Sequence, residues 1–119
     1  MRIPKQCVCD ALTASSGLAA LIGDRIYHER PPETPVWPLI TYKQVAGTAD
    51  KADGINYMGR ARIEIKAWGD EGLEDIADEI LAAMNTCRGG PVLVFETELP
   101  DGVTLKRIHI MDFNLIVKL

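Results

Sequence analysis

The segment from Arg60 to Trp68 alternates between two kinds of residue with a period of two. Its odd-numbered residues are Ala or Ile, whereas its even-numbered residues are charged or, at Trp68, aromatic. Successive side chains of a strand point to opposite faces, so one face of this segment packs and the other meets water or a partner. The pattern predicts a strand with a single buried face.

A different period follows Gly69. Apolar residues recur there at the spacing of an amphipathic helix, at Leu73, Ile76, Ala77, Ile80, Leu81 and Met84. A strand and a helix, each with one apolar face, predict the two layers of an α+β sandwich. Upstream, the sequence predicts a helix that starts near Pro4 and a short second helix, which Ser15 or Ser16 caps and Gly23 ends.

The rest of the chain predicts a mainly antiparallel sheet. Arg25–Tyr27 is a short extended piece, and four prolines between His28 and Pro38 predict a stiff surface connection. The small, polar segment Gly47–Asn56 predicts a mobile loop around an Asp53-Gly54 turn. The fold class is therefore α+β, one domain over 1–119, with helices on one face of about four strands: Leu39–Ala46, Tyr57–Trp68, Val92–Leu99 and Thr104–Lys118.

The last strand changes phase along its length. Met111, Phe113 and Leu115 share one face, but the upstream Ile108 and Ile110 fall on the other. A bulge near Ile110 would rotate the phase and bury every apolar residue. Otherwise the strand has apolar groups on both faces, and the second face is either buried in the core or in contact with another subunit.

Composition argues against several classes of protein. Hydrophobic residues make up 47% of the 119 residues and the net charge is -4, which suits a folded domain and argues against sequence-specific binding of nucleic acid. The apolar runs are too short to span a membrane, and no signal region follows the N-terminal basic residues. Cys7, Cys9 and Cys87 are an odd number, which predicts reduced thiols rather than a disulfide framework.

No residue set predicts an enzyme, a metal site or a cofactor. The helix after Gly69 carries acids at Asp70, Glu71, Glu74, Asp75, Asp78 and Glu79, several of them four residues apart. A metal would need converging oxygens from other segments, so we interpret this face as solvated or as the contact for a basic partner. Trp37 and Trp68 either cover the edge of the core or anchor a partner.

Several short motifs in a fixed order resemble one family. Gly-Asp-Arg-Ile-Tyr at 23–27 follows a helix, a proline-rich connection ends in Pro-Leu-Ile-Thr-Tyr at 38–42, and an Asp-Gly loop precedes the strand Arg62–Trp68 and the second long helix. Over nearly the whole chain this arrangement resembles the tail-completion or tail-terminator family of tailed bacteriophages and prophages.

The resemblance implies a structural virion protein without catalytic residues. Such a protein forms a hexameric ring at the head-proximal end of the tail, stops growth of the tail tube and joins the tail to the head connector. Its partners would be further copies of itself, tail-tube proteins and connector proteins, assembled in the cytoplasm of the bacterial host. Two alternatives remain: another head–tail junction protein, such as a head-closure or minor tail component, and a small ligand-binding or regulatory domain.

A ring needs two different patches of one subunit to meet on neighbours. We expect an acidic patch on the main helix to meet a basic patch on the central strand, with apolar area from the last strand. The segment 49–54 would be a mobile assembly loop. The expected interface residues are Arg60, Arg62, Lys66, Glu71, Glu74, Asp75, Asp78, Ile108 and Ile110, and the expected loop residues are Ala49, Asp50, Lys51, Ala52, Asp53 and Gly54.

Overall fold

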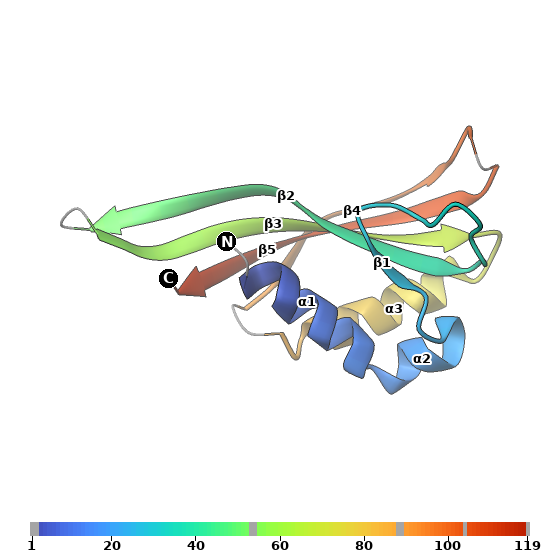
Figure 1. The fold of residues 1–119 in the computed structure, drawn as a ribbon, viewed down its shortest axis with the longest axis horizontal. Helices are drawn as coiled ribbons and strands as arrows, with labels where there is room; N and C mark the ends of the chain where they lie inside the picture. The colour runs from blue at the N-terminus through green and yellow to red at the C-terminus, as the bar shows by residue number, and fades with distance from the viewer. Residues whose placement is uncertain (1–2, 53–54, 88–89, 104, 119) are drawn as a thin grey trace.

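All helices in the described part of the chain lie on one face of a single sheet (Figure 1). The computed structural model describes residues 3–52, 55–87, 90–103 and 105–118. No helix within those ranges is long and apolar enough to cross a membrane. In chain order the elements are α1 (Ile3–Ala14), α2 (Ser16–Ile22), β1 (Ile26–His28), β2 (Leu39–Ala52), β3 (Ile55–Gly69), α3 (Leu73–Met84), β4 (Val92–Pro100) and β5 (Arg107–Lys118).

The sheet confirms the predicted α+β class and adds one strand. Its order is β1-β2-β3-β5-β4. The pairs β2–β3, β3–β5 and β5–β4 are antiparallel. The three-residue strand β1, expected only as an extended piece, pairs parallel with Ile40–Tyr42 on the outer side of β2. The sheet is therefore mixed, and its two edges are β1 and β4.

The central hairpin is longer than expected, and the prediction of a loop over Gly47–Asn56 is wrong. β2 continues to Ala52 and β3 begins at Ile55, with Gly47 paired to Ala61 and Ala52 paired to Ile55. Asp53 and Gly54 lie outside the described residues. Small polar residues have low strand propensity, but ladder pairing overrides it here, because β5 also pairs with β3 as far as Met58.

This length gives the molecule its shape. The distal half of the hairpin extends beyond the helices (Figure 1), and the molecule measures 50 × 30 × 24 Å. We call backbone residues 47–52 and 55–60 the hairpin arm. The helix layer ends where the arm begins, so the arm is a part of the sheet that the helices of its own chain do not cover.

The core lies between the sheet and the helices. The odd-numbered apolar residues of β3, Ala61 to Ala67, are all buried, as the alternation predicted. Register places Ile63 beside Phe113 and Ile65 beside Met111, so β5 continues the same apolar surface. The helices close this surface with their buried faces: Val8, Ala11 and Leu12 of α1, Leu18 and Ile22 of α2, and Leu73, Ile76, Ala77, Ile80, Ala83 and Met84 of α3.

Both ends of α2 follow the sequence signals. The Ser15 hydroxyl accepts a hydrogen bond from the N–H of Leu18 at 3.2 Å, which makes Ser15 the N-cap. Gly23 ends the helix with φ 63°, a conformation that favours glycine. In α3, Leu81 departs from the predicted apolar stripe: it is 39% exposed, because it lies one position round the helix from the buried Ile80.

The predicted bulge near Ile110 is wrong. β5 pairs with β3 without interruption from Arg107 to Lys118, and the register shift on this side of the sheet lies in β4, between Leu93 and Phe95. β5 therefore has apolar residues on both faces. On the face away from the helices Ile108 is buried beside Trp68 and Leu99, its register partners, so part of that second face is covered within the chain.

Replacing Ile80 with Ala should lower the free energy of unfolding by about 2–5 kcal/mol, because the side chain is fully buried and its loss leaves a cavity. The neighbouring Leu81→Ala is the matched control and should cost less than about 1 kcal/mol, since Leu81 is partly in solvent. Urea denaturation of both variants gives the two values. Equal losses would contradict the assigned helix face.

Candidate assembly surfaces

The acidic face of α3 points away from the core. Glu71, Glu74, Asp75 and Asp78 are exposed, and among the described residues no basic side chain pairs with them. Glu79 differs, because it is half-buried and lies against Gly17 of α2, where any larger residue would meet its carboxylate. The first-turn acids Glu74 and Asp75 also favour the positive end of the helix dipole.

A shallow depression lies beside this face, between the start of α3 and the β4–β5 hairpin. Its lining is mostly acidic: Asp70, Glu71, Gly72, Leu73, Glu74, Asp75, Glu98 and Arg107. Arg107 binds Glu98 at 2.9 Å and Lys106 binds Asp70 at 2.8 Å, so two of the carboxylates have partners. Within the described residues no group of three His, Cys, Asp or Glu side chains is arranged to hold a metal ion.

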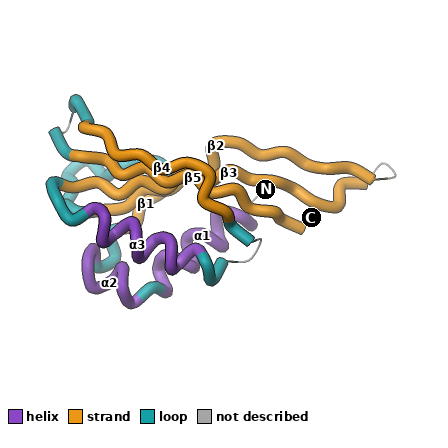
Figure 2. The backbone as a smooth tube through the Cα atoms, turned by 180° about the vertical axis from the view of Figure 1, so that it is seen from behind, coloured by secondary structure: helices purple, strands orange, loops and turns teal. Residues whose placement is uncertain are grey.

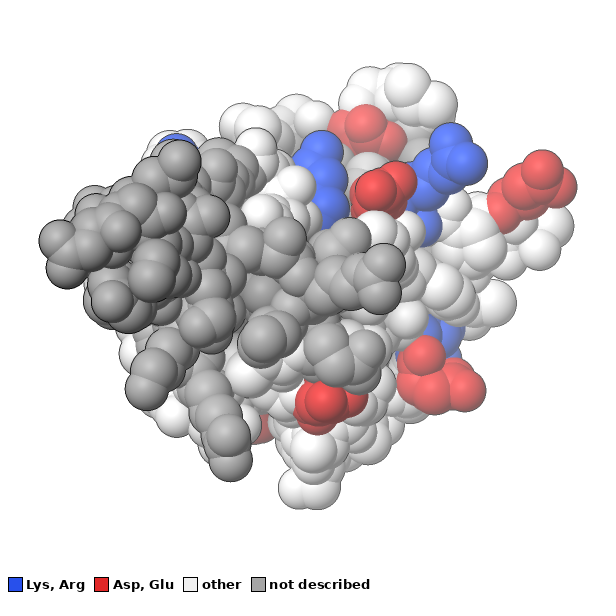
Figure 3. All heavy atoms as spheres, turned by 60° about the vertical axis from the view of Figure 1, so that its left-hand side comes forward, with Lys and Arg blue, Asp and Glu red and all other residues white. Residues whose placement is uncertain are grey.

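Two of the basic residues predicted on the central strand, Arg62 and Lys66, lie on the other face of the sheet. Arg62 donates two hydrogen bonds to Asp112 Oδ2, at 2.7 Å from Nη2 and 3.2 Å from Nε. Lys66 binds Glu64 at 3.3 Å, and Lys43 approaches the same carboxylate at 3.9 Å. Both charges therefore have partners within the chain. Figure 3 shows Lys and Arg side chains lying among Asp and Glu side chains on the visible surface.

The structure does not bring the two predicted patches together in one chain. Glu74, Asp75 and Asp78 are on α3, below the sheet, and Asp70 and Glu71, expected on this helix, lie just before it. Arg62 and Lys66 are on the face that carries no helix. Arg60 is in β3, opposite Thr48 of β2, where the arm begins. Of the apolar residues assigned to the interface, Ile108 is buried and Ile110 is partly exposed.

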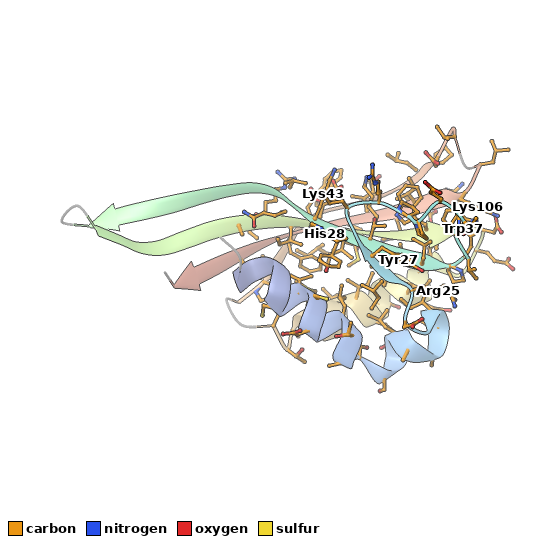
Figure 4. All side chains as sticks on the ribbon, in the orientation of Figure 1. Arg25, Tyr27, His28, Trp37, Lys43 and Lys106 are labelled. Carbon is orange, nitrogen blue, oxygen red and sulfur yellow. The ribbon has the colours of Figure 1, made fainter. Side chains whose placement is uncertain are left out.

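The two tryptophans cover one end of the face opposite the helices. Their rings are 6.3 Å apart, and the indole N–H of Trp68 donates to Thr41 Oγ1 at 2.9 Å. Lys106 lies 5.9 Å from the centroid of the Trp37 ring (Figure 4). Both tryptophans are half-buried, so each covers part of the core edge and leaves part of its ring open to solvent or to a partner.

The cysteines are in the helix layer. Cys87 is buried, and burial, followed by a hydrogen bond with the Cys7 thiol, raises the pKa of Cys87 to about 12. Burial beside Cys9 likewise raises the pKa of the Tyr42 hydroxyl to about 12. A thiol with so high a pKa stays protonated near neutral pH, so Cys87 is a poor nucleophile and a poor metal ligand.

Sequence reasoning missed one surface, the strand β4. Val92, Val94, Phe95 and Leu99 are 45–59% exposed, and we call these four residues the edge patch. The sequence does hold a signal, because Val-Leu-Val-Phe at 92–95 does not alternate as a half-buried strand should. What the sequence does not contain is strand order, so it could not show that β4 is an edge.

Comparison with known proteins identifies the family. The family model described as tail completion protein gp17 matches residues 6–109. The chain belongs to this family. The tail completion proteins are structural proteins of the virion tail, as the resemblance in sequence implied.

A solved structure shares the fold of this tail completion protein. It is titled "Virion of native gene transfer agent (GTA) particle"; its TM-score is 0.75 at 16% identity, and the match covers 94% of this chain and 92% of that chain. Among curated proteins, none matches the sequence.

The pair Arg62–Asp112 should matter more for stability than for assembly. Arg62→Met would leave the buried Asp112 carboxylate without its donor, and should lower the free energy of unfolding by about 1–3 kcal/mol. The matched control Lys43→Met breaks a longer contact, 3.9 Å, to a carboxylate that is more exposed than that of Asp112, and it should cost less than about 1 kcal/mol. Thermal unfolding of both variants is the measurement, and a smaller loss for Arg62→Met than for Lys43→Met would contradict this role.

Proposed function

We infer that this tail completion protein forms a hexameric ring at the head-proximal end of the tail, where it ends growth of the tube and joins the tail to the head. The observation that carries the inference is the family match over residues 6–109. The likeness of the fold to a chain in a gene transfer agent virion supports it. In the virion the partners are further copies of the chain, tail-tube proteins and connector proteins.

The ring contact we propose joins opposite charges from two sides of the subunit. The exposed acids of α3 lie on the helix side, and the predicted basic patch lies on the side without helices. A heterologous contact uses two different patches, so patches on opposite sides suit a ring and do not suit a symmetric dimer. Since Arg62 and Lys66 already bind carboxylates of their own chain, we assign the basic side of the contact to Arg60, whose backbone pairs with Thr48 at the base of the hairpin arm.

The hairpin arm is the proposed contact with the tube or the connector. It extends beyond the helix layer, so its tip can reach a neighbouring ring without moving the core (Figure 1). We therefore propose the assembly role expected from the sequence for the segment 49–54, of which residues 49–52 are paired with β3 rather than part of an open loop.

The decisive experiment is electron microscopy of particles made without this protein. Tubes of uncontrolled length that are not attached to heads are expected, because the ring would both end the tube and bind the head. Tubes of normal length that are not attached to heads would contradict the terminator role and support the alternative, another head–tail junction component. Heads carrying normal tails would contradict both.

Reversing charge on the acidic face should weaken assembly and leave the fold intact. Glu74→Lys combined with Asp78→Lys exchanges one like-charge pair for another and removes an acid from the first turn, so α3 should lose at most about 1 kcal/mol. We expect ring formation about tenfold weaker or worse in sedimentation, whereas the melting temperature should fall by no more than about 8 °C.

The matched control is Glu33→Lys, an exposed acid in the connection before β2, which should not change assembly. Added salt should weaken the native ring modestly and should have less effect on the double variant. Assembly of the double variant at native strength would exclude the acidic face from the contact.

A further inference from the structure

The strand β4 is an edge that its own chain leaves open. It ends the strand order next to β5, and within the described residues no further strand pairs with its outer side (Figure 2). An open edge presents a row of backbone N–H and C=O groups that another strand can use. β4 is nine residues long, enough to offer several such bonds.

Natural edge strands usually carry features that prevent pairing, such as lysines, inward charges, prolines or bulges. β4 has a register shift between Leu93 and Phe95, and Pro100 stands only at its end. Yet its first four residues are all apolar, and the edge patch leaves three of them exposed. The strand therefore has the composition of a pairing surface rather than of a protected edge.

The opposite edge of the sheet offers a matching partner. β1 pairs only with Ile40–Tyr42, so among the described residues the outer side of β2 is unpaired from Lys43 to Ala52. This stretch is ten residues long, close to the nine residues of β4. Its direction also fits. Three successive antiparallel pairings make β4 antiparallel to β2, so two copies placed side by side present antiparallel edges to one another.

We propose that β4 of one copy pairs with the segment Lys43–Ala52 of β2 in the next copy, so that the sheet is continuous across each subunit contact. The proposal rests on the ring of the proposed function and names its backbone contact. Hydrogen bonds along the two edges hold the copies together, and the edge patch meets the exposed Val45 of the next copy.

Charge selects this pairing over a symmetric one. The charged residues of β4 are Glu96 and Glu98, both acidic. Arg107 of the same chain binds Glu98, so the repulsion between two β4 strands placed edge to edge comes mainly from Glu96. The segment 43–52 contains two lysines and one aspartate, Lys43, Lys51 and Asp50, so its formal charge is opposite in sign to that of β4. A contact between unlike edges is heterologous, and repeated around an axis it closes a ring.

The test replaces Val94 with a photo-cross-linking phenylalanine derivative, in the purified protein at high concentration and in completed tails. Val94 lies in the irregular part of β4 and is 45% exposed, so the probe should not disturb the core. Mass spectrometry of the cross-linked peptides should identify residues 43–52 of another copy. Cross-links from Val94 to β4 of another copy, to a different protein alone, or to nothing would each overturn the proposal.

The same probe at Leu21, on α2 and 40% exposed, is the matched control and should not cross-link to residues 43–52. Microscopy of the same tails separates this proposal from the proposed function. A ring at the tail end without the 43–52 cross-link overturns the edge contact alone. Purified copies that form this cross-link but are absent from the tail end overturn the proposed position and leave the edge contact standing.

Discussion

The pairing of β3 on both of its sides is the constraint on which the rest of the structure depends. β2 and β5 both run along it, and the register of these ladders determines what each face of the sheet carries. Because side chains alternate, Ile63 and Ile65 point to the helices, while Arg62 and Glu64 point the other way. A slip of one residue would exchange the two faces, so the register determines both the core and the polar surface.

The two faces of the sheet are stabilised by different interactions. On the helix side, burial of aliphatic groups from α1, α2 and α3 against the sheet supplies the main attraction. On the other side, polar side chains at the centre pair with one another, and two tryptophans cover one end. The arm lies past the helix layer, where backbone pairing among β2, β3 and β5 continues.

How much the sequence could predict depended on whether the signal was local. The buried face of β3, the stripe of α3 and the cap at Ser15 were predictable, because each follows from residues near in sequence. The extended hairpin was not, since residues 47–52 become a strand only through pairing with β3. The bulge in β4 and the partner of Arg62 were not predictable either. Both depend on residues that are far apart in sequence, Phe95 with Asp112 and Arg62 with Asp112, so no local pattern predicts them.

The same distinction separates residues that stabilise the chain from residues available to assemble it. The sequence made Arg62 a candidate for the interface, but in the structure its guanidinium binds Asp112 of the same chain. A substitution of Arg62 therefore changes the stability of the fold as well as any contact between subunits. The groups that the described fold leaves without partners are elsewhere: the acids of α3, the outer side of β4 and the outer side of β2 beyond β1. These surfaces differ in chemistry and lie on different sides of the subunit. In a symmetric dimer each surface meets its own copy, so two different surfaces cannot pair with one another there. When unlike surfaces pair, every added subunit exposes the same two surfaces at the ends of the assembly, until the last subunit meets the first and closes a ring.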